Sequence, residues 1–326
     1  MGLPLSNNSK SESELSLNFS LFSVDRIIDN SVTDFDLFAD VNSHIILYSG
    51  TGYKWFRSEL DGLVKNGYRN FWIRNEDSTK ASIYENMNRL PEISRTLRPE
   101  DRLQKIQDIG MTFTRYLYEG EITESVVIKA KELAGHIVEC IQEDGGCIRS
   151  ITGLANHDMY TYLHSIRVAS YSTAIAAQMG LTNAEDLKNI ALGSLFHDVG
   201  KSSVPLEIIN KTGPLLEHEW ALMKSHPTEG IKKINDTILH HVCREIVVHH
   251  HERLNGSGYP DGLTKDSLLN EVQIATLADI FDALTSSRSY QNKRTRFEAL
   301  DFIKTRLIKT EVSVDAFKAL VECLVK

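Results

Sequence analysis

Seven side chains that commonly bind metal ions lie in the second half of this 326-residue chain. Five are histidines and two are aspartates: His164, His197, Asp198, His226, His250, His251 and Asp279. Neutral imidazoles mixed with carboxylates hold divalent transition-metal ions, and clusters of such ions hydrolyse phosphate esters. These residue types therefore predict a metal-dependent phosphohydrolase, provided that the fold brings them together.

The surroundings of these residues make the pattern more specific. Lys201 follows the His-Asp pair at residues 197–198, and the paired histidines lead into a glycine-rich run. That run ends in Gly258-Tyr259-Pro260. In these features the chain resembles the HD-GYP group of the HD phosphohydrolase superfamily, over roughly half its length from residue 158 onward. A lone His-Asp pair is a weak signal, whereas the complete ordered series is a specific one.

The resemblance implies an activity and a set of metal ligands. HD-GYP proteins hydrolyse the bacterial messenger cyclic di-GMP, which implies cyclic di-GMP as the partner and either pGpG or GMP as the final product. The implied ligands are His164, His197, Asp198, His226, His250, His251 and Asp279. Asp198 would bridge two divalent ions that hold a hydroxide as the nucleophile. The family favours iron or manganese, and the ligand set also suits zinc.

The same resemblance implies catalytic and substrate-binding residues. Asp198 and Lys201 would be catalytic, and Lys201 and Arg288 would offer positive donors to a phosphate oxygen in the transition state. Gly258, Tyr259 and Pro260 would contact the substrate, because glycines allow close backbone turns and a tyrosine can donate a hydrogen bond or stack on a base. Ordinary surface charge and a structural turn are the alternative explanations.

The chain departs from the family pattern at two places. Tyr160 stands where members with a third ion carry a glutamate, so we expect two ions. After Arg288 the family usually has Pro-Tyr and a basic residue, and here Gln291 stands in the basic position. That phosphate contact is either missing or supplied by Lys293 or Arg294. A degenerate cyclic-dinucleotide receptor and a hydrolase of another cyclic dinucleotide, such as cyclic GMP-AMP, therefore stay open as alternatives.

Two side chains next to the expected ligands are assigned other roles. Histidines occupy positions 249–251, but successive helical residues point about 100° apart, so the three cannot all face one ion. The resemblance selects His250 and His251, which leaves His249 outside the site. Asp282 lies one helical turn after Asp279, and we expect it to organise hydrogen bonds rather than bind metal.

The composition narrows the class of protein. Hydrophobic residues make up 41% of the chain, and the formal net charge is −8. An acidic chain is a poor partner for a nucleic-acid polymer, because such binding depends on many lysines and arginines. There is no apolar stretch long enough to span a membrane and no secretory signal. Four cysteines without CxxC spacing favour reduced thiols and a cytoplasmic location.

The hydrophobic periodicity predicts a mainly α protein: an all-helical HD-GYP domain preceded by a small α/β N-terminal domain. We expect a flexible tail at residues 1–20, an accessory regulatory domain at 21–90, a helical linker at 91–150 and the HD-GYP domain at 151–326. Strands are predicted at 36–41, 44–48 and 71–73, with a helix at 56–64 between them. The accessory domain carries no ligand motif, and protein partners through it are left open.

Helix signals precede the His-Asp pair. A short heptad-like seam in the linker is formed by Val126, Ala130, Leu133, Ile137 and Cys140. It could join two subunits into a homodimer or pack on its own chain. Gly180 is expected to end a helix, and Thr182 with Glu185 is expected to form a capping box for the next one. That next helix is apolar, and His197 should lie near its end.

Overall fold

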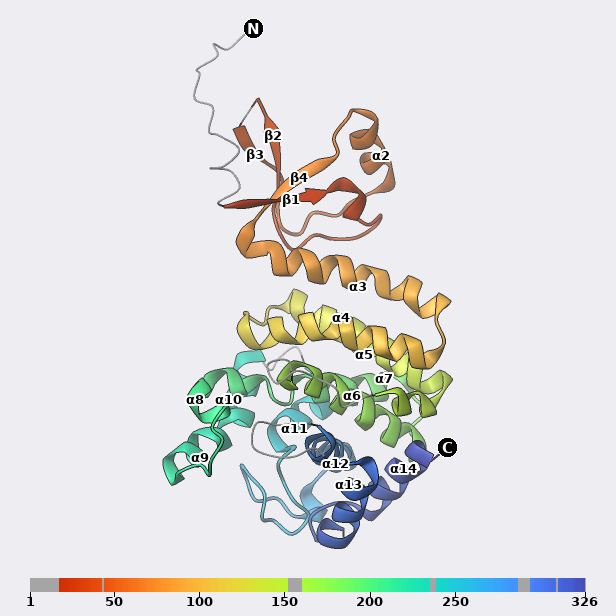
Figure 1. Cartoon of the computed structure of the whole chain (residues 1–326), viewed down its shortest axis with the longest axis vertical. Helices are drawn as coiled ribbons and strands as arrows, with labels where there is room; N and C mark the ends of the chain where they lie inside the picture. Colours follow the sequence, from red (N-terminus) through yellow and green to blue (C-terminus); the bar gives the residue numbers. More distant parts are fainter. Residues whose placement is uncertain are drawn as a thin grey trace. The chain divides into compact units, whose positions relative to one another are not determined.

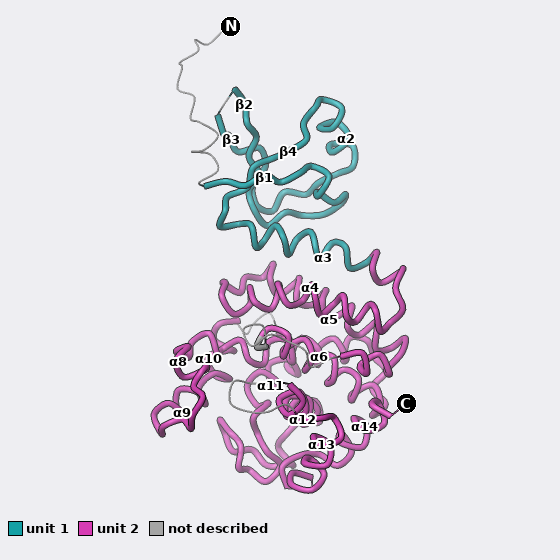
Figure 2. The backbone as a smooth tube through the Cα atoms, viewed as in Figure 1, with its two compact units in different colours: residues 1–91 teal, residues 92–326 magenta. Residues whose placement is uncertain are grey.

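The computed structural model describes residues 18–42, 44–151, 160–234, 239–286, 294–308 and 310–325. The chain divides into two compact units, residues 1–91 and 92–326 (Figures 1 and 2). The first contains a four-stranded sheet, and the described part of the second is built from helices and loops. The protein is therefore mainly α with a small strand-containing N-terminal unit, as predicted.

The sheet of the first unit is antiparallel, in the order β1-β4-β2-β3. Its strands are β1 (Phe19–Ser23), β2 (Leu37–Val41), β3 (His44–Ser49) and β4 (Asn70–Arg74). The three predicted strands are confirmed, but β1 was missed. Phe19 and Ser20 were assigned to the tail, and they pair instead with Arg74 and Ile73 of β4. The pairing joins segments distant in sequence, so local patterning did not reveal it. Residues 1–17 of the predicted tail lie outside the described residues.

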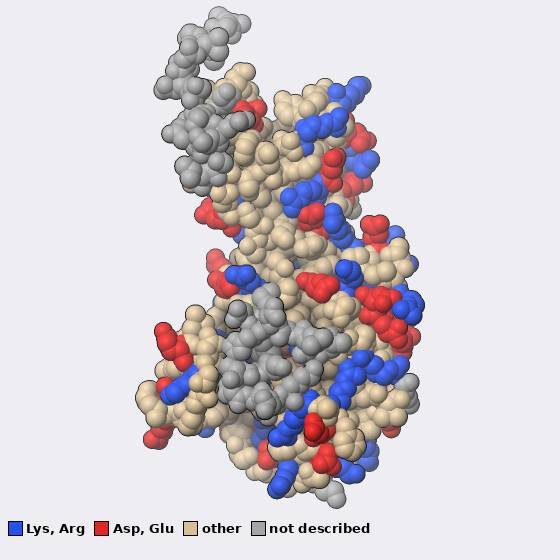
Figure 3. Space-filling model, in the orientation of Figure 1, with Lys and Arg blue, Asp and Glu red and all other residues tan. Residues whose placement is uncertain are grey.

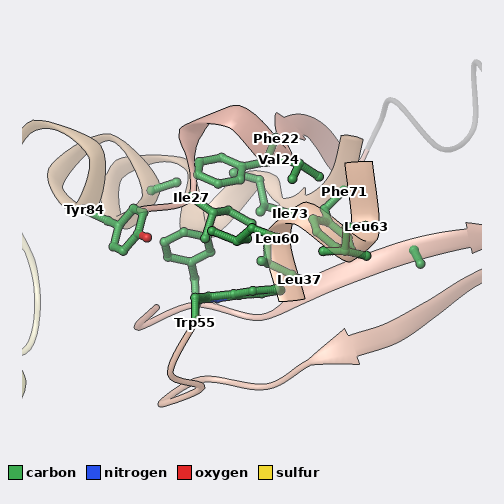
Figure 4. Packing of buried hydrophobic residues seen from close by; sticks show 13 residues of the cluster. Phe22, Val24, Ile27, Leu37, Trp55, Leu60, Leu63, Phe71, Ile73 and Tyr84 are labelled. Carbon is green, nitrogen blue, oxygen red and sulfur yellow. The ribbon is translucent and has the colours of Figure 1, made fainter. Parts of the chain in front are cut away.

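Helices cover one face of this sheet. They are α2 (Arg57–Lys65) and α3 (Ser78–Thr96), the latter ending just inside the second unit. Between sheet and helices lies an apolar cluster that includes the fully buried Trp55 and Phe71, together with Tyr84 of α3 (Figure 4). No group of three or more potential metal ligands occurs among the described residues of this unit.

The second unit is a helical assembly around one central helix. Its longer helices are α4 (Pro99–Glu119), α5 (Glu124–Glu143), α6 (Tyr160–Gln178), α7 (Ala184–Phe196), α12 (Asn270–Thr285) and α14 (Val314–Val325). The shorter ones are η5 (Val199–Ser203), α8 (Leu206–Ile209), α9 (Glu217–Lys224), α10 (His226–Ile234), α11 (His241–His249) and α13 (Arg296–Phe302). Helix α6 contacts α4, α5, α7, α12 and α14. A residue on α6 is therefore held from several sides.

The segment expected to be a linker, residues 91–150, belongs from residue 92 onward to the same compact unit as the helices that follow it. Its helix α5 packs against α4, α6 and α7. The seam residues are all buried in the chain itself: Val126, Ala130, Leu133, Ile137 and Cys140. Of the two alternatives for this seam, packing on its own chain is the one observed. The seam offers no open surface to a second subunit.

Helix α7 leads directly into the His-Asp pair. Gly180 has φ = 97° and ends the preceding helical segment, as expected. The predicted capping box is wrong, because the N-cap is Asn183, whose side chain accepts hydrogen bonds from the backbone of Glu185 and Asp186. The asparagine carbonyl thus takes the role given to Thr182. His197 immediately follows α7, so its expected place at the end of a buried helix is confirmed.

Two properties of the surface bear on the expected partners. No helix in the described ranges combines the length and the apolar character required to cross a bilayer. On the face shown in Figure 3, the lysines and arginines that the structure describes are interspersed with aspartates and glutamates.

Candidate metal centre

The seven expected ligands converge in the second unit, although five different elements supply them. His164 comes from α6, Asp279 from α12 and His226 from the first residue of α10. Two residue pairs follow the ends of α7 and α11: His197-Asp198 and His250-His251. They form two groups, one of His164, His197 and Asp279 and the other of Asp198, His226, His250 and His251, with the ligand atoms of each group within 4.8 Å of one another.

Asp198 lies between the two groups. Its Oδ1 is 3.2 Å from His226 Nε2, in the group to which Asp198 itself is assigned. Its Oδ2 is 3.3 Å from His197 Nε2 and 3.6 Å from His164 Nε2, in the other group. One carboxylate thus turns an oxygen toward each set of imidazoles. This is the geometry that a bridging ligand requires.

The imidazoles are oriented by hydrogen bonds on their outer nitrogens. In three of them Nδ1 donates to a backbone carbonyl oxygen: His197 to Ser194 at 2.7 Å, His226 to Met223 at 2.7 Å and His250 to Val247 at 3.1 Å. A carbonyl oxygen can only accept, so Nδ1 carries the proton and Nε2 keeps its lone pair. Each Nε2 is therefore available to a cation at the centre.

His164 is oriented by a side-chain network that sequence reasoning only partly found. Its Nδ1 donates to Asp282 Oδ2 at 2.8 Å, which matches the expectation that Asp282 organises hydrogen bonds. The hydroxyl of Ser286 donates to the same carboxylate oxygen at 3.3 Å, and Arg167 donates to that hydroxyl at 3.1 Å. Arg167 and Ser286 carry no motif, so nothing in the sequence indicated their role.

Burial makes the cluster costly without a cation. His197 Nε2 and Asp198 Oδ1 are buried and form no hydrogen bond of good geometry within the described residues. Buried polar atoms without partners are rare because leaving water costs them free energy. Divalent cations, one held by each group, would satisfy both atoms. The residues present therefore fit a bound metal.

The protonation states of three candidate ligands suit metal binding, whereas Asp279 and Asp282 raise the pKa of His164 against the opposing effect of its burial. Burial lowers the pKa of both His250 and His251 well below the usual value for histidine, which keeps their imidazoles neutral. Burial alone would raise the pKa of Asp198, but Lys201 and His197 hold that pKa well below its usual range. Neutral imidazole and ionised carboxylate are the forms that bind metals.

Lys201 reaches into the centre from η5. Its Nζ donates to Asp198 Oδ2 at 2.5 Å, and 19% of its side chain is exposed. The ammonium therefore lies at the solvent-facing edge of the bridging carboxylate. The expected position of this lysine beside the metal ligands agrees with the structure, and its phosphate contact stays a prediction.

The loop of Gly258-Tyr259-Pro260 lies against the cluster. The rings of Tyr259 and His251 have centroids 4.7 Å apart and an interplanar angle of 31°. A Cβ atom on Gly258 would come within 2.3 Å of the Cα of Glu252 and within 2.6 Å of the backbone of its neighbours, so only glycine fits there. The loop is thereby held close to the two histidine ligands that precede it.

Glu252 anchors this loop, and sequence reasoning gave it no role. Its carboxylate is buried and accepts backbone hydrogen bonds from three consecutive residues: Asp261 at 2.7 Å, Gly262 at 2.9 Å and Leu263 at 3.1 Å. A charged residue directly after two ligands was the available signal. Its partners lie about ten positions ahead, so the purpose of the charge could not be read locally.

Several expected residues lie away from the centre or outside the described ranges. The imidazole of His249 forms hydrogen bonds with Glu245 at 3.0 Å and with Asp261 at 3.0 Å. This first histidine of the run therefore faces away from the cluster, as expected. Arg288 lies outside the described residues, as do Gln291 and Lys293 and the side chain of Tyr160. The guanidinium of Arg294 lies 4.1 Å from the ring centroid of Phe302.

Close packing of two glycines fixes the distance between η5 and α10. A Cβ atom on Gly200 would lie 1.9 Å from the carbonyl oxygen of His226 and 2.4 Å from the backbone nitrogen of Gly230. No side chain fits between these backbones. The contact positions His226 beside Asp198, two residues before Gly200.

Comparisons with known proteins agree with this arrangement. The family model of the HD domain matches residues 151–307, which include all seven ligands and the Gly-Tyr-Pro segment. A cyclic di-GMP phosphodiesterase of Pseudomonas aeruginosa is 32% identical over 178 residues, covering 52% of this chain and 41% of that protein. A 3'3'-cGAMP-specific phosphodiesterase of Vibrio cholerae is 40% identical over 139 residues, covering 41% of this chain and 26% of that protein.

A further curated relative is a cyclic di-GMP phosphodiesterase of Thermotoga maritima, 37% identical over 166 residues, with 49% of this chain and 44% of that protein covered. The chain thus spans less than half the length of these curated relatives. A solved structure, Bd1817, a HDG"Y"P protein from Bdellovibrio bacteriovorus, shares the fold over 94% of this chain and 99% of its own, with a TM-score of 0.64 and 21% identity. With the ordered ligands and the Gly-Tyr-Pro loop inside the matched residues, this chain belongs to the HD-GYP family of HD-domain proteins.

Proposed function

We propose that this protein is a metal-dependent phosphodiesterase that hydrolyses cyclic di-GMP to pGpG and then to GMP. The observation that carries the proposal is the pair of ligand groups joined by the Asp198 carboxylate. Relatives that are named phosphodiesterases of cyclic dinucleotides support the class of reaction. The choice of cyclic di-GMP follows the names of the Pseudomonas aeruginosa and Thermotoga maritima relatives.

The proposed cofactor is a pair of divalent ions, iron or manganese, with zinc as an acceptable substitute for this nitrogen and oxygen ligand set. One ion would be held by His164, His197 and Asp279, the other by His226, His250 and His251, with Asp198 shared. Bound ions of this kind polarise a phosphoryl oxygen and lower the pKa of a coordinated water, which supplies a nucleophile near neutral pH.

The residues of the chain supply positioning and charge. Lys201 lies at the exposed edge of Asp198, where its ammonium can donate to a non-bridging phosphate oxygen as negative charge develops. We assign Arg288 a second such contact, from the sequence pattern alone. Gly258 and Pro260 shape the loop that presents Tyr259 to the substrate, beside the imidazole of His251.

A cleavage assay tests this proposal directly. Protein loaded with manganese or iron is incubated with cyclic di-GMP, and the products are separated by chromatography. We expect pGpG to appear first and GMP later, and the His197→Ala variant to release neither. Cyclic di-GMP that is bound but stays intact over a long incubation would instead support the receptor alternative, which Gln291 suggests.

A second candidate substrate is 3'3'-cyclic GMP-AMP. The observation that favours it is the 40% identity to a Vibrio cholerae enzyme named as specific for that dinucleotide. Parallel measurement of kcat/KM on both cyclic dinucleotides decides between them. The substrate with the larger value is the assigned one.

Location and partners complete the proposal. We place the protein in the cytoplasm, because all four cysteines are free and buried, as expected in a reducing compartment. We assign the N-terminal unit a regulatory role, with protein partners as one means of exercising it. We do not assign a homodimer to the α5 seam, since its residues are covered by their own chain.

A further inference from the structure

Helix α9 places an aromatic and a cationic side chain beside the Gly-Tyr-Pro loop. The ammonium of Lys224 lies 5.9 Å from the ring centroid of Trp220, one turn earlier on the same helix. The same ammonium lies 5.7 Å from the ring centroid of Tyr259, across the gap from α9 to the loop. Tyr259 in turn packs on His251, a member of the metal-binding cluster. One lysine is thus flanked by two aromatic rings at the edge of the candidate metal centre.

The end of α9 is fixed relative to the cluster. The carbonyl of Met223, the residue before Lys224, accepts the hydrogen bond from Nδ1 of His226 at 2.7 Å. At the other end of the helix, Glu219 accepts a hydrogen bond from the backbone of Leu216 at 2.6 Å and pairs with Lys211. The lysine therefore projects from a helix that is fastened directly to a candidate ligand.

Trp220 and Lys224 of α9, here called the aromatic arm, are open to a ligand. Within the described part of the chain, the Lys224 ammonium forms no ion pair and no hydrogen bond, and its side chain is exposed. Trp220 is 46% exposed, although large aromatic side chains are usually buried. An exposed indole beside an ammonium whose described contacts are with aromatic rings is a surface on which a base can stack.

The chemistry of the arm selects among bases. The O6 and N7 atoms of guanine are both acceptors, whereas adenine presents an amino donor at the position of O6. A lysine ammonium only donates, so it can bond to both guanine atoms but is opposed by the adenine amino group. We propose that Trp220, Lys224 and Tyr259 form a guanine-recognition subsite, in which a ring stacks on the base and Lys224 reads its O6 and N7 edge. This inference rests on the proposed cyclic-dinucleotide substrate.

Tryptophan fluorescence gives a readout of this subsite that does not need turnover. The chain has three tryptophans, and Trp55 and Trp72 both belong to the first unit, so Trp220 is the reporter of the second. The ligands are the cleavage-resistant bis-phosphorothioate analogues of cyclic di-GMP and cyclic di-AMP, titrated into the manganese-loaded full chain. We expect the guanine analogue to quench the emission and the Trp220→Phe variant to lose that quenching.

The selectivity of binding tests the role of the lysine. We expect the unaltered protein to bind the guanine analogue about tenfold more tightly than the adenine analogue, the size of effect that one lysine-to-guanine contact supplies. In Lys224→Met we expect this ratio to fall to within about twofold, chiefly through weaker binding of the guanine analogue. Since Lys224 is exposed, the substitution should leave the fold intact, which circular dichroism checks.

A second lysine serves as the matched control for Lys224. Lys232→Met, on the neighbouring helix α10 and paired with Glu229, should keep the full preference for guanine. Equal weakening of both analogues in Lys224→Met would overturn the proposal and assign the lysine to a phosphate instead. Quenching that persists unchanged in Lys224→Met, with the same selectivity, would also overturn it. Binding of the guanine analogue with the expected selectivity but no cleavage of cyclic di-GMP would refute the proposed activity and leave the subsite standing.

Discussion

Each unit of this protein contains a buried cluster that differs in chemistry from the one compared with it in the other unit. In the first unit Trp55 and Phe71 are completely buried, and they are surrounded by other apolar groups. In the second unit His226 and His250 are equally buried, and they are surrounded by imidazoles and carboxylates. Apolar burial stabilises a fold by about 25 cal/mol for each Å² removed from water, whereas burial of polar groups without partners costs free energy.

The comparison separates an apolar cluster that stabilises the fold from the polar cluster that carries the candidate metal ligands. The apolar cluster of the first unit is explained completely by stability. Stability does not explain the polar cluster of the second unit. Some of its buried atoms have no hydrogen-bond partner within the described residues, and apolar residues in their place would avoid that cost in free energy. A bound ligand would offset this cost in free energy, and we therefore interpret the polar cluster as a binding site.

The largest expected effect on activity comes from a substitution in the polar cluster of the second unit. Asp198→Ala removes the carboxylate shared by both ligand groups, and we expect kcat/KM for cyclic dinucleotide hydrolysis to fall about 10⁴-fold, or about 5.5 kcal/mol. Metal analysis of the purified variant should show fewer bound ions. Asp315→Ala, an exposed aspartate on α14, is the control and should keep full activity. Retention of a tenth of the activity by Asp198→Ala would contradict the bridging role.

The next largest expected effect is on the stability of the first unit, through its apolar cluster. Trp55→Ala leaves a cavity in the first unit, and we expect its free energy of unfolding to fall by about 4 kcal/mol, measured by circular dichroism in urea. The metal content should not change, because no candidate ligand in the described residues lies in this unit. Leu47→Ala, in β3 of the same unit but 57% exposed, should change stability by less than about 0.5 kcal/mol. Loss of metal in Trp55→Ala would show that the two regions are not independent.

Addition of metal should stabilise the second unit and leave the stability of the first unit unchanged. With free manganese at a hundred times its dissociation constant, we expect the second unit to gain about 2.7 kcal/mol. Hydrogen exchange followed by mass spectrometry should then show slower exchange in α6, α7 and α12 and unchanged exchange in β2 and β4. The Asp198→Ala variant is the control and should show no gain. Equal protection of the sheet would mean that metal acts on the whole chain.

The smallest effect comes from a residue that only orients a ligand. In Asp282→Asn the bond to His164 Nδ1 is weakened, and we expect manganese affinity to fall about 30-fold, or about 2 kcal/mol. Isothermal titration calorimetry measures the change. His249→Gln alters a nearby histidine that bonds to Glu245 and Asp261 instead of facing the cluster, and should leave the affinity unchanged. A similar loss in both variants would point to a general disturbance of the site.

The sequence revealed the members of the site better than their arrangement. Residue types and order singled out the seven ligands because those features are local to the chain. Their division into two groups depends on how α6, α7, α10, α11 and α12 pack, which no local pattern contains. The same limit hid Arg167, whose link to His164 passes through Asp282, more than a hundred positions away.

The elements were predicted where periodicity was strong and missed where partners were remote. The strands β2, β3 and β4 alternate clearly and were found. Strand β1 pairs with a strand that lies about fifty residues ahead, and it was missed, with its first two residues assigned to the tail. The seam of α5 left two alternatives open, because an apolar stripe fits a second subunit as well as it fits the same chain. Only the three-dimensional contacts of α5 could decide between them.

The contact between Gly200 and Gly230 has a consequence for how the site tolerates change. Here main chain touches main chain, so the gap between Asp198 and His226 is set by the thickness of two backbones and not by a choice of rotamers. Side-chain motion elsewhere in the unit cannot loosen that dimension. A side chain at position 200 would push η5 away from α10 and so move Asp198 away from His226, which makes this glycine as restricted in sequence as the candidate ligands themselves.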